Sequence, residues 1–104
     1  MIARIWKGTT PEAKSERYLA YLNTTGVKEC LATAGNREVY VLRRIGGGRA
    51  EFVFISMWES LEAIRRFAGK DIDKAVYFPE DREYLLEMEP HVAHYEVAVA
   101  AQAG

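Results

Sequence analysis

The stretch Phe52-Val53-Phe54-Ile55-Ser56-Met57-Trp58 decides the fold. Successive side chains of a strand point to opposite faces of the sheet. One face of this run therefore carries its aromatic residues, and the other carries Val53, Ile55 and Met57. Neither face is polar enough to lie against water, so the run predicts a strand in the centre of a sheet.

Three further strands are predicted around this one. Arg37 to Ile45 alternates aliphatic and long polar side chains, and Gly46-Gly47-Gly48 follows it. Two such runs joined by a glycine-rich turn are typical of a β-hairpin. The run from Ile2 to Lys7 predicts a first strand, and the run from His91 to Ala100 predicts a last one.

Helices are predicted between the strands. The first begins with Thr10 as its N-cap and Pro11 at its first helical position, and it continues to Leu22. A short continuation over residues 27–34 ends at Gly35-Asn36. Ser60 begins a second helix, which Gly69 ends. Residues 79–86 predict a small extra helix before the last strand.

The resulting order, β-α-β-β-α-β, predicts an α+β domain of the ferredoxin-like, split βαβ type. Both main helices then cover one face of the sheet, and the apolar residues of the opposite face need a partner. A second copy is the simplest partner, because two-fold symmetry lets the same face pack against itself. We therefore expect a homodimer formed through the sheet face, a dimeric α+β barrel.

Composition excludes several classes of protein. The 104 residues are 49% hydrophobic and 28% charged, which indicates one globular domain over residues 1–100 with a disordered tail over 101–104. Fourteen basic and fifteen acidic residues give a net charge of −1, so neither a nucleic acid nor a membrane surface is an expected partner. A single cysteine, Cys30, excludes an internal disulfide. We expect a cytoplasmic protein.

The run from residue 52 to Ile64, with Trp58-Glu59-Ser60 leading into a helix that carries Ala63, Ile64 and Phe67, resembles a known family. It is similar to the antibiotic biosynthesis monooxygenase-like proteins, which are dimeric α+β barrels, and the resemblance covers Met1 to Val99. That family includes cofactor-free oxygenases acting on quinols and polyketide aromatics, haem-degrading enzymes and members of no known activity.

The resemblance argues against haem degradation. Haem-degrading members of the family use an asparagine on the first strand, a tryptophan on the second helix and a histidine after that helix. Alignment on Trp58 puts Phe67 in place of the tryptophan and Tyr77 in place of the histidine, and the first strand offers Trp6 or Lys7. The resemblance therefore implies a cofactor-independent monooxygenase of a small aromatic or quinol-type substrate. A non-catalytic small-molecule-binding protein and a structural dimeric barrel remain alternatives.

Two polar residues are the candidate catalytic groups. His94 shares a strand face with Glu96 and is a candidate proton acceptor, or else an interface histidine. Arg4 is a candidate for binding a substrate oxygen, or else it pairs with Glu59 or Glu96. No cluster of histidine, cysteine or acidic residues has the spacing of metal ligands, so neither a metal site nor a cofactor is expected.

Aromatic residues are the candidate substrate-binding groups, because an apolar cavity with a few polar groups suits an aromatic ligand. In the family the pocket lies between the sheet and the helices. The alternative for most of these residues is a place in the core. The candidates are Trp58, Phe67, Tyr77, Phe78 and Tyr95.

Overall fold

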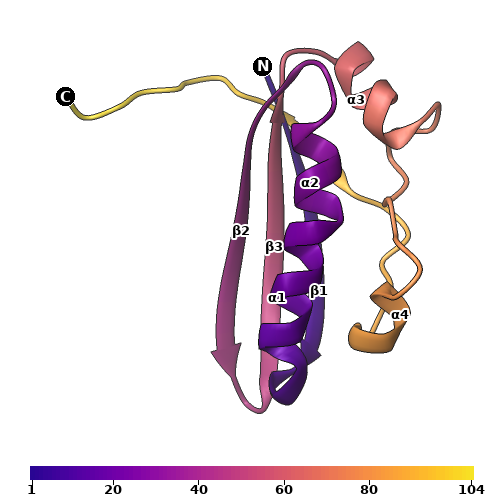
Figure 1. Cartoon of the computed structure of the whole chain (residues 1–104). Helices are drawn as coiled ribbons and strands as arrows, with labels where there is room; N and C mark the ends of the chain where they lie inside the picture. Colours follow the sequence, from indigo (N-terminus) through magenta and orange to yellow (C-terminus); the bar gives the residue numbers. More distant parts are fainter.

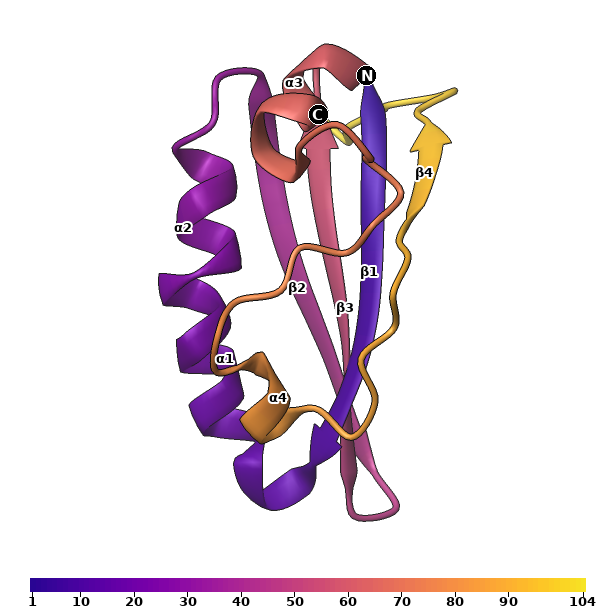
Figure 2. The same cartoon turned by 90° about the vertical axis from the view of Figure 1, so that its right-hand side faces the viewer.

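Four antiparallel strands form one sheet in the computed structural model, which describes residues 1–104. The strand order is β2-β3-β1-β4, which is the order of the split βαβ fold. The helices all lie on one side of this sheet, as the two views in Figures 1 and 2 show. The predicted α+β fold class is therefore confirmed. The strands are β1 (Ile2–Pro11), β2 (Asn36–Gly46), β3 (Arg49–Trp58) and β4 (Ala93–Glu96).

Strand β3 lies between β2 and β1, as its two apolar faces predict. Phe52, Phe54 and Trp58 on one face are buried under the helices, while Val53 and Ile55 on the other face are half-buried. The hairpin turn between β2 and β3 places Gly47 and Gly48 at φ values of 60° and 77°, which favour glycine.

Strand β1 is longer than predicted and changes how the first helix begins. It pairs with β3 from Ile2 through Pro11, so Thr10 is a buried strand residue and not a helix N-cap. The hydroxyl of Thr10 donates to the carbonyl of Pro11. A 3-10 turn, η1 (Glu12–Lys14), follows, and α1 (Ser15–Thr24) begins only after it. Strand pairing along the full length of β3 outweighs the local helix-start signal.

The helical layer consists of α1, the continuation α2 (Gly26–Leu31), α3 (Leu61–Ala68) and the single turn α4 (Asp81–Tyr84). Ser60 caps α3 as predicted, because its hydroxyl accepts a hydrogen bond from the amide of Ala63 at 3.1 Å. Gly69, at φ 84°, ends that helix. The core lies between this layer and the sheet, and Trp58, Tyr18, Phe52 and Ile64 are its largest fully buried side chains.

The chain between α3 and β4 has little regular structure, although it crosses the whole helical face (Figure 2). We call residues 69–80 the crossing segment. Strand β4 is shorter than the predicted run from His91 to Ala100, because the backbone of His91 pairs with Lys74 of this segment and β4 pairs only with Ile2 to Ile5. After Glu96 the chain leaves the sheet and projects away from the helices (Figure 1).

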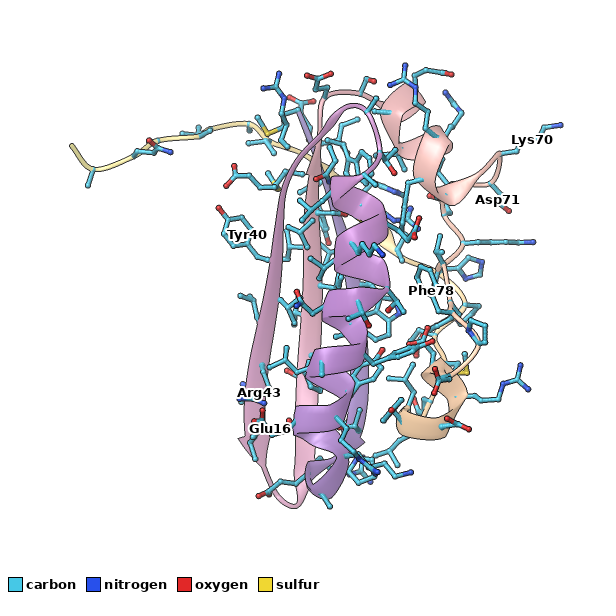
Figure 3. The ribbon with its side chains drawn as sticks, in the orientation of Figure 1. Glu16, Tyr40, Arg43, Lys70, Asp71 and Phe78 are labelled. Atoms are coloured by element: carbon cyan, nitrogen blue, oxygen red, sulfur yellow. The ribbon has the colours of Figure 1, made fainter.

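The face of the sheet opposite the helices, which we call the open face, is largely apolar. Ile5 and Ile55 are half-buried at its centre. Tyr40 and Leu42 of β2 are each 49% exposed beside them. Figure 3 shows Tyr40 extending on this side and Phe78 on the helical side. No helix has the length and apolar character needed to span a bilayer.

Candidate functional site

A cavity of about 50 Å³ lies between the sheet, the helical layer and the crossing segment. Twelve residues line it, nine of them hydrophobic. The polar side chains on its wall come from different elements, so folding brings them together from distant parts of the sequence. The wall consists of Arg4, Trp6 and Phe54 from the sheet, Tyr18, Leu22 and Gly26 from α1 and α2, and Phe67, Val76, Tyr77, Phe78, Asp81 and Val92 from later parts of the chain.

Arg4 is the cation of this cavity. It is only 4% exposed, and its guanidinium donates to the main-chain carbonyls of Ile72 and Lys74, the latter at 2.9 Å. No carboxylate forms an ion pair with it, so the predicted pairing with Glu59 or Glu96 is absent. Burial lowers the pKa of Arg4, but an arginine remains charged at any physiological pH. A positive charge therefore lies on the wall of a largely apolar cavity.

His94 lies behind Arg4, and the cavity wall does not include it. Its Nε2 is 2.9 Å from Arg4 Nη1, and its Nδ1 is 3.3 Å from a carboxylate oxygen of Asp73. Because the guanidinium can only donate, Nε2 accepts and Nδ1 carries the proton. Burial and the charge of Arg4 lower the pKa of His94, which keeps the ring neutral near pH 7. Both ring nitrogens are thus engaged, and this geometry positions Arg4.

Asp81 is a buried carboxyl group at another part of the wall. It is 3% exposed, and its two oxygens accept hydrogen bonds from the Tyr18 hydroxyl at 3.0 Å and from the Phe78 amide at 2.6 Å. Burial raises the pKa of Asp81, although these two hydrogen bonds act in the opposite direction. Burial and the neighbouring Asp81 raise the pKa of Tyr18, so its phenol is neutral and a donor.

Aromatic side chains form the apolar wall. The indole of Trp6 donates to the Tyr77 hydroxyl at 3.0 Å, and that hydroxyl donates to the carbonyl of Glu89 at 2.5 Å. The rings of Trp6 and Tyr77 meet edge to face, with their centroids 6.1 Å apart. Phe67 lies beneath the guanidinium of Arg4, which is 5.9 Å from the ring centroid. These contacts connect the crossing segment to the sheet and hold Arg4 over an aromatic ring.

The structure brings four of the seven predicted site residues onto one wall, namely Arg4, Phe67, Tyr77 and Phe78. The others lie elsewhere. Trp58 is fully buried beneath Phe67, at a centroid separation of 5.7 Å, and its indole donates to Ser56. Tyr95 is 58% exposed on the open face, because alternation along β4 points it to the other side of the sheet from His94.

The sequence led to no individual role for Asp81, Tyr18 or Trp6. The sequence did indicate that Tyr18 has a partner, because a tyrosine on the apolar face of a helix needs a hydrogen-bond partner for its hydroxyl. The spacing of 63 residues between Tyr18 and Asp81 gave no way to identify that partner.

Two other side chains have structural roles only. Cys30 is fully buried, which raises its pKa to about 12 and makes it an inert hydrophobic residue. Arg43 forms a 2.7 Å ion pair with Glu16 of α1 (Figure 3). It is the neighbouring Arg44 that pairs with Glu51, at 3.0 Å, because odd-numbered residues of β2 face the helices.

Comparison with known proteins gives the fold its name. No sequence-family model matches the chain, and no curated protein matches it either. Among solved structures, a proposed antibiotic biosynthesis monooxygenase from Bacillus cereus matches with 19% identity and a TM-score of 0.69, over 98% of this chain and 97% of the other. The fold is that of the antibiotic biosynthesis monooxygenase-like proteins.

Two further structures share this fold. A variant of MhuD, with two manganese protoporphyrin IX molecules per active site, has 17% identity and a TM-score of 0.62, over 99% and 100% of the two chains. A conserved protein from Methanosarcina mazei has 16% identity and a TM-score of 0.59, over 91% of each chain. At such low identity these likenesses define the architecture, and the site must be judged from its own residues.

Proposed function

We propose that this protein is a cofactor-independent monooxygenase that oxidises a small, electron-rich phenol or quinol with dioxygen. The observation that carries the proposal is Arg4, a buried cation held over Phe67 at the wall of an aromatic-lined cavity. No carboxylate forms an ion pair with it, since Asp73, whose charge acts on Arg4, contacts His94 instead. Such a group favours an anionic oxygen on an aromatic ligand, because a charge interaction is strong where water is excluded.

The phenolate itself supplies the electrons. It transfers one electron to dioxygen, and the resulting superoxide and phenoxyl radical combine to form a C–O bond at a ring carbon that bears hydrogen. The distal peroxide oxygen takes up the proton that the phenol gave up. Loss of the proton from the ring carbon then forms the C=O bond, breaks the O–O bond and releases hydroxide, which combines with that second proton to give water. The sum is phenol plus dioxygen to quinone plus water. Arg4 binds the phenolate oxygen, and His94 positions Arg4.

The size of the cavity sets a condition on binding. About 50 Å³ holds a few waters, whereas an engineered cavity that binds benzene measures roughly 150 Å³. A substrate must therefore displace part of the wall. The crossing segment is the part that lacks regular structure, and it contributes Val76, Tyr77 and Phe78. We propose that these residues move outward when an aromatic ligand binds.

The same observation supports the alternative function, non-catalytic binding of a small molecule. A small cavity with a fixed cation suits an anion even where no oxidation follows. Oxygen consumption distinguishes the two functions, because a binding protein would shift the ligand spectrum without consuming dioxygen.

We also propose that the protein acts as a homodimer in the cytoplasm. The apolar open face supports the dimer, since contiguous exposed apolar surface marks an interface. The free thiol of Cys30, buried and unpaired, is compatible with a reducing compartment.

The test uses 1,5-dihydroxynaphthalene, whose monooxygenation yields 5-hydroxy-1,4-naphthoquinone and water. We expect one dioxygen consumed per quinone formed, one labelled oxygen atom incorporated from labelled dioxygen, and no loss of rate with chelators. Arg4→Met should lower the rate by ~10²-fold or more, the scale for losing a group that stabilises an oxyanion. Arg65→Met, at an exposed position on α3, is the matched control. A wild-type rate equal to spontaneous autoxidation would refute the proposal.

A further inference from the structure

The buried carboxyl group of Asp81 has no part in the chemistry described so far. No lysine, arginine or histidine forms an ion pair with it, and its nearest polar partners are the Tyr18 hydroxyl and the Phe78 amide. A buried carboxylate without a cation is costly, so its presence on a cavity wall needs a reason.

A purely structural role does not require an acid at this position. An asparagine could accept from the Phe78 amide through its oxygen and donate to the Tyr18 oxygen through its nitrogen, without the cost of a buried charge. The ionisable group is therefore the feature that distinguishes Asp81 from a simple connector between α1 and α4. Each carboxylate oxygen also keeps one lone-pair direction that neither Tyr18 nor Phe78 uses.

Asp81 and Arg4 line the cavity from different elements, the turn α4 and strand β1. Tyr18, which holds Asp81, packs edge to face on Phe52 at a centroid distance of 5.2 Å, and Phe52 pairs with Gly8 of β1. Gly8 is four positions along β1 from Arg4, which corresponds to roughly 13 Å at the rise of a strand. The contacts of Tyr18 thus place Asp81 away from Arg4 along the sheet, and a ligand in this cavity meets a cation and a carboxyl group at separate places on an aromatic-rich wall.

We propose that Asp81 is the proton acceptor of this cavity and that the ligand is an aromatic with two polar ends, an anionic oxygen at Arg4 and a hydroxyl at Asp81. This inference rests on the function proposed above. In the step assigned to Asp81, a carboxylate oxygen forms a bond to the hydroxyl proton of the ligand, and the O–H electron pair stays on the ligand oxygen. The ring becomes more electron-rich and reduces dioxygen more readily. The proton then leaves Asp81 with the departing hydroxide as water.

Binding of a redox-inert ligand tests this without relying on oxidation. The probe is 6-hydroxy-2-naphthoate, which carries a carboxylate at one end and a hydroxyl at the other, and the comparison ligand is 6-methoxy-2-naphthoate. We expect the wild-type protein to bind the hydroxyl probe ~10-fold or more tightly than the methoxy one, the range for a hydrogen bond to a charged group. Asp81→Asn should lose most of that preference, and Arg4→Met should weaken both ligands.

A matched control and a second variant keep the test clear. Asp71→Asn, at an exposed position in the crossing segment, should behave like the wild type. Tyr18→Phe removes a hydrogen bond that lowers the pKa of Asp81, so the pH at which the hydroxyl preference appears should move upward. The ionisable groups that face Asp81 are Tyr18 of α1 and Tyr77 of the crossing segment. Both are neutral phenols, so this shift reports on Asp81.

The outcomes separate the two proposals. An unchanged preference in a folded Asp81→Asn protein, or a wild-type protein that binds neither naphthoate, would overturn the role of Asp81. If the preference for the hydroxyl probe depends on Asp81 while 1,5-dihydroxynaphthalene is not oxidised, the proposed monooxygenase function is refuted and the proposed Asp81 binding site is supported. If Asp81→Asn oxidises that substrate as fast as the wild type across the pH range, Asp81 is not the proton acceptor. Circular dichroism confirms that each variant is folded.

Discussion

The position of the Arg4 guanidinium depends on one neutral histidine. His94 accepts a hydrogen bond from the guanidinium through Nε2, and a protonated ring could not do so. Protonation would also put two positive charges side by side in a buried site. The pKa of His94 is accordingly lowered, by burial first and by Arg4 second.

This lowered pKa predicts a pH-dependent stability. Between the ordinary pKa of about 6.5 and the lower folded value, the unfolded chain binds a proton that the folded chain does not. The free energy of unfolding should therefore fall as the pH decreases through that window, by at most about 1.4 kcal/mol per pH unit from this group. Above pH 6.5 His94 contributes no pH dependence to the free energy of unfolding.

Urea denaturation at pH 7.5 and pH 5.0 measures this effect. His94→Gln keeps a neutral acceptor and should lose less stability than the wild type between the two pH values. His91→Gln removes the other histidine, which is exposed, and should keep the wild-type slope. Equal slopes for the wild type and His94→Gln would show that His94 does not titrate differently on folding.

Phe67 and Tyr77 lead to a negative prediction for haem. No histidine or cysteine lies on the cavity wall, and Tyr77 uses its hydroxyl to join Trp6 to Glu89. Haem added with a reductant should yield neither a verdoheme-like nor a biliverdin-like product. Absorption spectra over the course of the reaction provide the measurement, and regiospecific turnover at ordinary rates would contradict the residue argument.

Sequence reasoning located individual site residues better than it assigned their roles. Arg4 could be singled out because an arginine on a buried strand must be paired, but its partners are main-chain carbonyls that no side-chain pattern encodes. His94 was expected to take a proton from a ligand, and its role changed because Arg4 pairs directly opposite it in the register of β1 and β4. No role could be assigned to Asp81, because its burial depends on how the crossing segment folds back onto α1.

At the scale of elements, periodicity predicted the strands and helices well and their ends poorly. The apolar alternation of residues 52–58 was enough to place β3 in the centre of the sheet. The signals at Thr10 and Pro11 were local, and the pairing of β1 with the whole length of β3 overrode them. The crossing segment has no period, and its course is set by single contacts such as that of Trp6 with Tyr77.

The junction between α2 and β2 gives a prediction at this scale. Gly35 has a φ of 95°, and a Cβ added there would lie 2.4 Å from the Cβ of Ala63 in α3. Gly35→Ala should therefore cost roughly 1–2 kcal/mol for the backbone conformation and roughly 1–3 kcal/mol more for the clash. Gly47→Ala shares the positive φ but meets nothing within 4 Å, so it should show the backbone cost alone.

Chemical denaturation of the two glycine variants measures the difference directly. A larger loss for Gly35→Ala would show that α3 is held tightly against the α2–β2 junction, which fixes Phe67 beneath Arg4. Equal losses would mean that α3 shifts freely to relieve the clash.

At the scale of the whole molecule, the open face predicts a dimer. Ile55 lies at its centre, between Tyr40 and Ile5 in the register of the three long strands. Light scattering at micromolar concentration should give about twice the chain mass of 11.8 kDa. Ile55→Lys should dissociate the dimer, because it would bury a charge in an apolar interface.

A control on the opposite side of the molecule guards against a general effect of charge. Leu31 of α2 is 62% exposed and lies on the helical side, so Leu31→Lys should leave the mass unchanged. A wild-type protein that is monomeric and stays in solution would contradict the dimer, and the open face would then need another explanation.

The main-chain oxygens of Ile72 and Lys74 hold the guanidinium of Arg4 in place, and this affects how the sequence around the site can change during evolution. Every amino acid carries the same carbonyl, so the exposed side chain of Lys74 can change without removing an acceptor of the guanidinium, whereas Ile72 packs against the core and should stay apolar. An alignment of sequences that share this fold and this site should therefore show Arg4 retained while the residue at position 74 varies. The position of the guanidinium then depends on the path of the backbone and not on the type of side chain, so a search for shared residue types would not detect it.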